Sequence, residues 1–169
     1  INKAIKIEPG NSEFYQNRAE IYEEYYDEAK SDLDRIDYWC GKAIYFDCKK
    51  LTEKTKPKFK SKVLKIIDKY QTKIINDFDK SISLDKVGND EYKDPHDTSW
   101  TYYLKASFLF YKTKEYRQAL FNLNQATKLI AFNSYNKDRN NMYRNLRAET
   151  FLKLNNIKAA CYDINLVKD

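Results

Sequence analysis

Side chains that carry enzymatic chemistry are few or isolated in this 169-residue sequence. The single histidine, His96, lies in a DPHD segment with no cysteine or second histidine nearby, so metal binding and general acid–base catalysis lack partner groups. The glycines are isolated, which excludes a glycine-rich phosphate loop. Acidic residues occur beside Lys and Arg at the spacing of solvated helix faces. We therefore predict no catalytic residue, no metal site and no cofactor, and a protein that is not an enzyme.

The three cysteines do not form a metal-binding or redox motif. Cys40 and Cys48 are eight residues apart in the sequence, which on one helix separates them by about 12 Å, too far for a disulfide. Cys161 lies far from both. We predict that all three are small core residues, and we expect a reducing compartment and a cytoplasmic protein.

Positive charge is concentrated in one segment of a chain whose net charge is +6. Between positions 49 and 65 the lysines face a single acidic residue, Glu53. Such a run can bind the phosphates of nucleic acid or of lipid headgroups. It can also be a solvated hairpin tip, since it contains no arginine for bidentate phosphate contacts. The predicted basic patch comprises Lys49, Lys50, Lys54, Lys56, Lys58, Lys60, Lys62 and Lys65.

The elements that must position these residues are predicted to be helices. Three glycines and three prolines leave few helix breakers, and no glycine-punctuated series of strands occurs. No apolar run approaches the roughly 18–20 residues that a membrane span requires. The length predicts one domain, 1–169. Because the first residue is Ile1 rather than Met, we expect a fragment of a longer chain.

The stretch from Trp100 to Ala131 has the pattern of two amphipathic helices joined by the polar turn KTKE. Small and large apolar residues recur three and four positions apart, the spacing of one helix face. Small residues facing large ones allow two helices to pack about 8–10 Å apart. These positions are Tyr103, Ala106, Ser107 and Phe110 in the first helix and Ala119, Leu123 and Ala126 in the second.

Similar patterns recur elsewhere in the chain. First-helix copies are Tyr15/Ala19/Tyr22 and Arg144/Ala148/Phe151; second-helix copies, with a polar residue before a bulky one, are Ala29/Asp32/Leu33, Ile74/Asp77/Phe78, Ala119/Asn122/Leu123 and Ala160/Asp163/Ile164. These patterns resemble the tetratricopeptide repeat, although Ser107 and Ala148 are 41 residues apart rather than the roughly 34 of that family. The resemblance implies an all-α superhelix, a solenoid of antiparallel helix pairs, with close contacts at Ala19, Ser107 and Ala148.

The middle of the chain predicts one extended helical hairpin. A seam that is apolar except at Asp47 runs from Ala29 to Leu51, and a second follows Pro57 at Val63, Ile67, Tyr70, Ile74, Phe78 and Ser81. We predict the hairpin turn at Thr55–Lys58, because proline disfavours helix before it. The alternative is that Trp39 begins a new repeat helix. The predicted parts are a first repeat at about 12–36, whose first helix ends at about Tyr25, the extended hairpin at 37–86, a central repeat at 98–131 and a last repeat at 139–168.

The resemblance also implies a concave groove lined by the first helices of the pairs. It would contain Gln16, Asn17, Glu20, Glu23, Leu104, Phe108, Tyr111, Asn145, Glu149 and Leu152. A mixed polar and apolar groove suits an extended peptide or a partner helix. We therefore expect a non-catalytic scaffold that binds a peptide segment or helix of a partner protein. The alternative is a nucleic-acid- or ribosome-associated protein that uses the lysine-rich hairpin.

Overall fold

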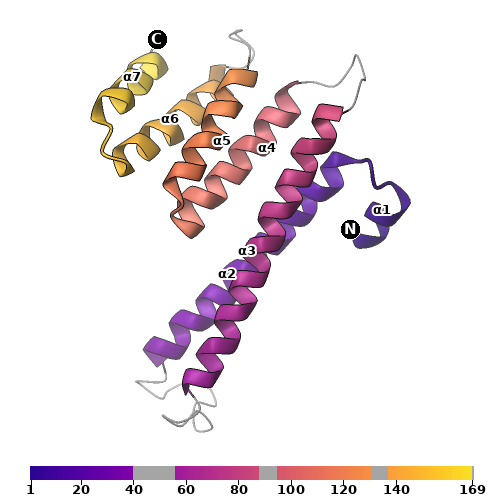
Figure 1. The fold of residues 1–169 in the computed structure, drawn as a ribbon. Helices are drawn as coiled ribbons and strands as arrows, with labels where there is room; N and C mark the ends of the chain where they lie inside the picture. The colour runs from indigo at the N-terminus through magenta and orange to yellow at the C-terminus, as the bar shows by residue number, and fades with distance from the viewer. Residues whose placement is uncertain (40–55, 88–94, 131–136, 169) are drawn as a thin grey trace. The chain divides into compact units, whose positions relative to one another are not determined.

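The computed structural model describes residues 1–39, 56–87, 95–130 and 137–168. Within these residues it contains seven α-helices, one π-helical turn and no strand, which confirms the all-α prediction. No helix in these ranges is long and apolar enough to cross a membrane. The elements are α1 (Asn2–Ile7), α2 (Ser12–Trp39), α3 (Lys56–Val87), α4 (Pro95–Phe108), η2 (Leu109–Thr113), α5 (Tyr116–Leu129), α6 (Lys137–Lys153) and α7 (Ile157–Lys168) (Figure 1).

The chain divides into two compact units, which are described separately. Unit 1 comprises Ile1–Pro9 and Glu13–Asp77, and therefore contains α1, nearly all of α2 and the first part of α3. Unit 2 comprises Gly10–Ser12 and Phe78–Asp169, and therefore contains the end of α3 and the helices α4 to α7.

Helix α2 is a single helix where the sequence predicted a helix pair. We expected a turn after Tyr25, but α2 continues without interruption from Ser12 to Trp39. No glycine or proline occurs in this range, and the buried residues Tyr15, Ala19, Tyr26 and Ala29 lie on one face of the helix, four, seven and three residues apart. One continuous seam gives the chain no reason to turn. Residues 12–36 are therefore not a separate helix–turn–helix repeat.

Helices α2 and α3 pack antiparallel within unit 1 (Figure 1). Near one end Arg18 bonds to Asp77, and further along α2 the ring of Tyr25 stacks on that of Tyr70 at a centroid distance of 5.5 Å. The predicted α3 seam is confirmed: all six positions are buried except Tyr70, which is half-buried. A long antiparallel hairpin therefore exists, but it begins at Ser12 rather than near residue 37.

The predicted position of the hairpin turn is wrong. Helix α3 begins at Lys56, so Pro57 and Lys58 lie in its first turn. Proline is tolerated there because the first N–H groups of a helix have no intrahelical acceptor. Residues 40–55 lie outside the described ranges. They include the turn itself, the seam from Cys40 to Leu51 and most of the alternative helix. That helix was expected to begin at Trp39, which is the last residue of α2.

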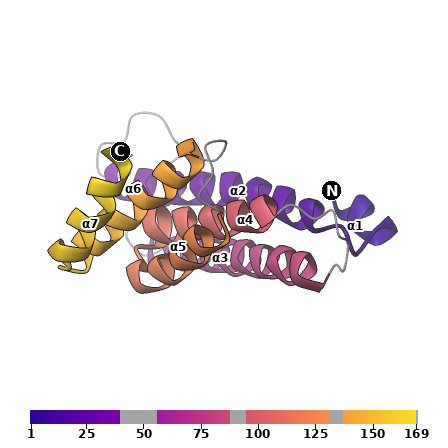
Figure 2. The same cartoon turned by 90° about the horizontal axis from the view of Figure 1, so that it is seen from above.

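Unit 2 contains two successive antiparallel helix pairs, α4–α5 and α6–α7 (Figures 1 and 2). Part of its core is formed by Ile82, Tyr102, Ala126, Ile130 and Tyr143. The two pairs turn in the same way: Lys114 and Asn155, 41 residues apart, both have left-handed backbones, with φ of 62° and 59°.

The π-helical turn η2 adds one residue to the first helix of the central pair. At the turn of the last pair, the Asn156 N–H donates to the Phe151 carbonyl, five residues back; at the central pair, the Glu115 N–H donates to Leu109, six residues back. Helix α4 therefore aligns with α6 at an offset of 42 residues. The prediction of Ser107 as a close contact is wrong by one position, because Ala106 is fully buried and Ser107 only partly. Ala19 and Ala148 are buried as predicted.

Candidate functional site

The residues predicted to line a groove are divided between the two units. Four lie on α2 in unit 1, where they are half-buried or exposed: Gln16, Asn17, Glu20 and Glu23. The Gln16 amide donates to the Glu20 carboxylate at 3.2 Å. The other six lie in unit 2, on α4, η2 and α6. The positions of these residues relative to one another can therefore be described only within each unit.

Phe108 is not a groove residue, since only 1% of it is exposed. It lies on the same face of α4 as Thr101 and Lys105, which are also buried, and the Lys105 ammonium forms an ion pair with Asp79 of α3. That face of α4 is therefore turned towards the end of α3. The error follows from the 41-residue alignment: at the observed offset of 42 the counterpart of Phe108 is Thr150, which is also fully buried.

The half-exposed face of α4 is aromatic. The ring of Tyr103 stacks on that of Trp100 at 5.2 Å and on that of Tyr143, from α6, at 4.9 Å. The guanidinium of Arg139 lies 5.5 Å from the Trp100 ring, within cation–π range. Tyr111, one of the predicted groove residues, follows on the same side of the helix and is 48% exposed.

Helix α6 supplies a negative charge to this aromatic face. Burial raises the pKa of Tyr103, and the charges of Tyr111, Tyr143 and Glu149 raise it further. Burial and then Glu149 raise the pKa of Tyr111. Both tyrosines are therefore neutral hydrogen-bond donors near a carboxylate at pH 7. We call Trp100, Tyr103, Ser107, Tyr111 and Glu149 the α4–α6 face.

The remaining predicted groove residues have mixed exposure. Asn145 and Leu152 are exposed on α6, with Leu152 at 49%, whereas Leu104 is half-buried on α4. Of the six predictions in unit 2, Tyr111 and Glu149 fall in the α4–α6 face. Sequence analysis missed Trp100 and Tyr103 as surface residues, because Tyr103 was assigned to helix packing and Trp100 was given no role.

The polar residue of the second-helix pattern is buried in three of its four copies. Asp77, Asn122 and Asp163 are 6%, 4% and 0% exposed. The exception is Asp32, which forms an i,i+3 ion pair with Arg35 at the surface, 3.7 Å apart. A buried carboxylate is destabilising unless it is paired and hydrogen-bonded, so each of the two buried aspartates requires a partner.

In unit 1 the partner of Asp77 is Arg18. Nε and Nη2 of Arg18 donate to the two carboxylate oxygens at 2.7 Å each, a bidentate geometry among the strongest hydrogen-bonded pairs. This bonding raises the pKa of Arg18. The third nitrogen, Nη1, donates to Asn2 of α1 at 3.0 Å. One guanidinium therefore links α1, α2 and α3.

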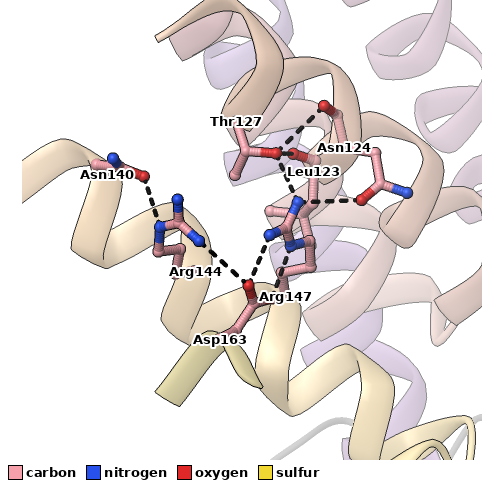
Figure 3. Close-up of polar contacts among 7 residues, drawn as sticks. All are labelled: Leu123, Asn124, Thr127, Asn140, Arg144, Arg147 and Asp163. Atoms are coloured by element: carbon pink, nitrogen blue, oxygen red, sulfur yellow. Dashed lines mark hydrogen bonds and ion pairs between the residues drawn. The ribbon is translucent and has the colours of Figure 1, made fainter. Parts of the chain in front are cut away.

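In unit 2 the partner of Asp163 is Arg147 (Figure 3). Its Nε and Nη2 donate to the carboxylate at 2.7 and 2.6 Å, while Nη1 donates to Thr127 at 2.7 Å and to Asn124 at 3.2 Å. Arg144 approaches the same carboxylate at 3.4 Å. Arg147 therefore joins α6 to both α7 and α5.

A sequence signal for these pairs exists but was not recognised. Arg18 directly precedes Ala19, and Arg147 directly precedes Ala148. At the corresponding place in the central pair, Lys105 precedes Ala106. A basic residue before the close-contact alanine, together with a buried Asp on another helix, would have predicted the two arginine pairs.

The basic patch is partly described. Lys56, Lys58, Lys60, Lys62 and Lys65 lie in the first turns of α3, exposed or half-exposed, and the first turn contains no acidic residue. The helix dipole has the same positive sign at this end. The other predicted members, Lys49, Lys50 and Lys54, lie outside the described residues.

Cysteines and metal ligands can be assessed within the described ranges. Cys161 is exposed and free on α7, so its prediction as a core residue is wrong. The neighbouring positions Ala160 and Asp163 are buried, which places Cys161 on the other side of the helix. Cys40 and Cys48 lie outside these ranges, within which no group of three or more His, Cys, Asp or Glu side chains could hold a metal ion.

These features define an all-helical protein in which unit 2 consists of antiparallel helix pairs with matching turns. Comparison with protein-family models, with curated proteins and with solved structures found no match to this chain.

Proposed function

We propose that this chain is a non-catalytic, tetratricopeptide-like scaffold that binds a peptide segment or helix of a partner protein through the α4–α6 face. The 41-residue recurrence of the turn between paired helices supports the repeat architecture. Stacked helix pairs expose an extended surface rather than a closed pocket. A surface of this kind suits recognition of another protein chain.

The observation that carries the proposal is the aromatic stack of Trp100 and Tyr103 on α4 with Tyr143 on α6. The three rings stack in sequence with interplanar angles of 24° and 23°, so ordering Trp100 and Tyr103 on binding costs little conformational entropy. Tyr111 is 48% exposed and Glu149 is exposed nearby. Aromatic anchors with a polar neighbour are the residues that carry most of the binding free energy at protein interfaces.

The test is peptide binding by the intact chain and by variants of exposed residues. Peptides selected from a random library are titrated by fluorescence polarisation against the wild type and Tyr111→Ala/Glu149→Ala. We expect this double variant to weaken binding by roughly 2 kcal/mol, or about 30-fold, because it removes an anchor and its polar neighbour. Tyr162→Ala, at a 65% exposed tyrosine of α7, is the matched control and should bind normally. If Tyr111→Ala/Glu149→Ala weakens the binding of none of the selected peptides, the proposal fails.

A second candidate function is favoured by the lysines in the first turns of α3. Their charge adds to that of the helix N-terminus with no acidic residue in the first turn, so an RNA oligonucleotide or the surface of a ribosome is the alternative ligand. Titration with an RNA oligonucleotide at low and high salt distinguishes the two, because phosphate contacts release counterions and lose affinity steeply with salt. Salt-sensitive RNA binding that is abolished by Lys58→Gln/Lys62→Gln would favour this alternative.

A further inference from the structure

A groove of about 610 Å³ lies in unit 2 between the end of α3 and α5, over α4. Its lining combines charged and apolar side chains. Among the apolar ones, Phe121 has the highest exposed fraction, 62%. The main lining residues are Asp79 and Ile82 of α3, Tyr102 and Lys105 of α4, and Arg117 and Phe121 of α5. The groove shares no residue with the α4–α6 face.

The equivalent place one helix pair later is occupied by the chain's own arginine. Arg147 of α6 lies between α5 and α7, where it donates to Asn124, Thr127 and Asp163 (Figure 3). Alignment of the two pairs makes Lys105 the counterpart of Arg147 and Asn122 the counterpart of Asp163. Alignment of the second-helix patterns likewise makes Asp79 the counterpart of Asn124.

Lysine and asparagine cannot reproduce the arginine–aspartate pair. An ammonium is a compact charge on a flexible stem, whereas a planar guanidinium can bond in several directions at once. Lys105 directs its ammonium to Asp79 of α3. Nothing equivalent to the bond between Arg147 and Asp163 is recorded between Lys105 and Asn122.

Asn122 is left with an unused acceptor. Its Nδ2 donates to the Gln118 carbonyl at 2.8 Å, and no partner for its Oδ1 is recorded among the described residues. Asn122 is only 4% exposed and lines the groove. A buried acceptor of this kind is destabilising until a donor reaches it. Arg117, exposed at the groove, also has no recorded partner in the described part of the chain.

We propose that this groove binds an acidic peptide segment of a partner protein. A carboxylate of the peptide pairs with Arg117, a backbone N–H donates to Oδ1 of Asn122, and an apolar side chain packs on Phe121. The charge of the lining supports an acidic ligand, because the basic residues Lys105 and Arg117 face one acidic residue, Asp79. This surface is an addition to the α4–α6 face and does not depend on that face binding anything.

The first test uses a random peptide library displayed on phage and selected on the intact chain. Selected peptides should be enriched in Asp or Glu next to an apolar residue. Their affinity, measured by fluorescence polarisation, should fall at least tenfold in Arg117→Glu and in Phe121→Ala. Both substitutions are at exposed positions, so the fold should survive. Lys128→Glu, at another exposed base of α5, makes the same charge change away from the groove and should bind normally.

The second test closes the groove with the chain's own chemistry. Lys105→Arg/Asn122→Asp reproduces the residues of the Arg147–Asp163 pair. We expect a higher denaturant midpoint together with at least tenfold weaker peptide binding, a combination that a general structural defect would not produce.

The proposal is overturned if no acidic peptide is enriched, or if the enriched peptides bind Arg117→Glu and Phe121→Ala as they bind the wild type. Loss of binding in Tyr111→Ala/Glu149→Ala alone would also overturn it, while supporting the α4–α6 face. Loss in the groove variants alone would support the groove and leave that face without a ligand. If Lys105→Arg/Asn122→Asp does not fold, the peptide affinities of Arg117→Glu and Phe121→Ala still decide whether the groove binds the peptide.

Discussion

The last helix pair and the central helix pair have the same antiparallel arrangement and similar turns, but they differ in the polar residues between their helices. In α6–α7, Arg147 neutralises the buried Asp163 and also bonds to α5. In α4–α5, Lys105 bonds to Asp79 of the neighbouring α3, and Asn122 replaces the aspartate. The difference teaches that a helix pair of this type can pack without the buried ion pair. A groove lined by charged and apolar side chains lies beside the position where the pair is replaced.

Unit 1 contains a second arginine–aspartate ion pair of this kind. Arg18 and Asp77 repeat the bidentate geometry of Arg147 and Asp163, although α2 is one long helix rather than part of a short repeat. In both places the arginine directly precedes a fully packed alanine, Ala19 or Ala148. The ion pair therefore accompanies close helix packing in two different contexts, and its absence from α4–α5 is a property of that pair.

The largest effect is expected from breaking the ion pair between Arg147 and Asp163 in the last helix pair. Asp163→Ala leaves Arg147, whose side chain is only 15% exposed, without its main acceptor and should reduce the free energy of unfolding by about 3–5 kcal/mol. The control, Asp32→Ala, removes a half-exposed surface pair and should change it by at most about 1 kcal/mol. Denaturant unfolding measures both. Similar small losses in the two variants would show that the buried pair contributes no more than a surface one.

A smaller effect is expected from testing the alignment of the two pairs. Ala106→Leu and Ala148→Leu should each cost on the order of 1–3 kcal/mol, because both alanines are at close helix contacts. Ser107→Leu, one position away and only partly buried, should cost less than Ala106→Leu in the same denaturant titration. If Ser107→Leu costs more than Ala106→Leu, the first helices align at 41 residues rather than 42, and η2 does not change their alignment.

The smallest effect concerns alkaline pH. Tyr103, Tyr111 and Tyr143 have a raised pKa in the fold, in each case mainly through burial. The unfolded chain therefore loses these protons first, so their contribution to stability is complete below the ordinary tyrosine pKa of about 10 and falls as the pH rises above it. Tyr143→Phe should show a smaller drop in denaturant midpoint between about pH 8 and pH 11 than the wild type. An equal drop would mean that Tyr143 does not contribute.

Local patterns predicted much of the fold because burial follows helix periodicity. The α3 seam and the buried Ala119, Leu123 and Ala126 were found from spacing alone. The turn expected after Tyr25 was wrong because the resemblance to a repeat was given more weight than the unbroken seam of α2. The π-helical turn left no comparable signal, since one extra residue changes the alignment without changing composition.

The candidate site was harder to predict, because it depends on which face of α4 each neighbour covers. Phe108 and Tyr111 are three residues apart, yet the first is fully buried and the second is 48% exposed. The choice between them follows from the ion pair of Lys105 with α3, a contact between segments distant in sequence. The polar residues of the second-helix pattern were recognised, but their arginine partners on other helices were not.

The bonds of Arg147 have a consequence for how unit 2 loses its structure. Where helix pairs stack on one another, stability is approximately the sum of a term for each pair and a term for each contact between neighbouring pairs. Arg147 contributes to both terms at once, since it bonds to α7 within its own pair and to α5 in the preceding pair. Fraying of α7 and detachment of α6 from α5 are therefore coupled events, and the three helices should open together as one cooperative segment.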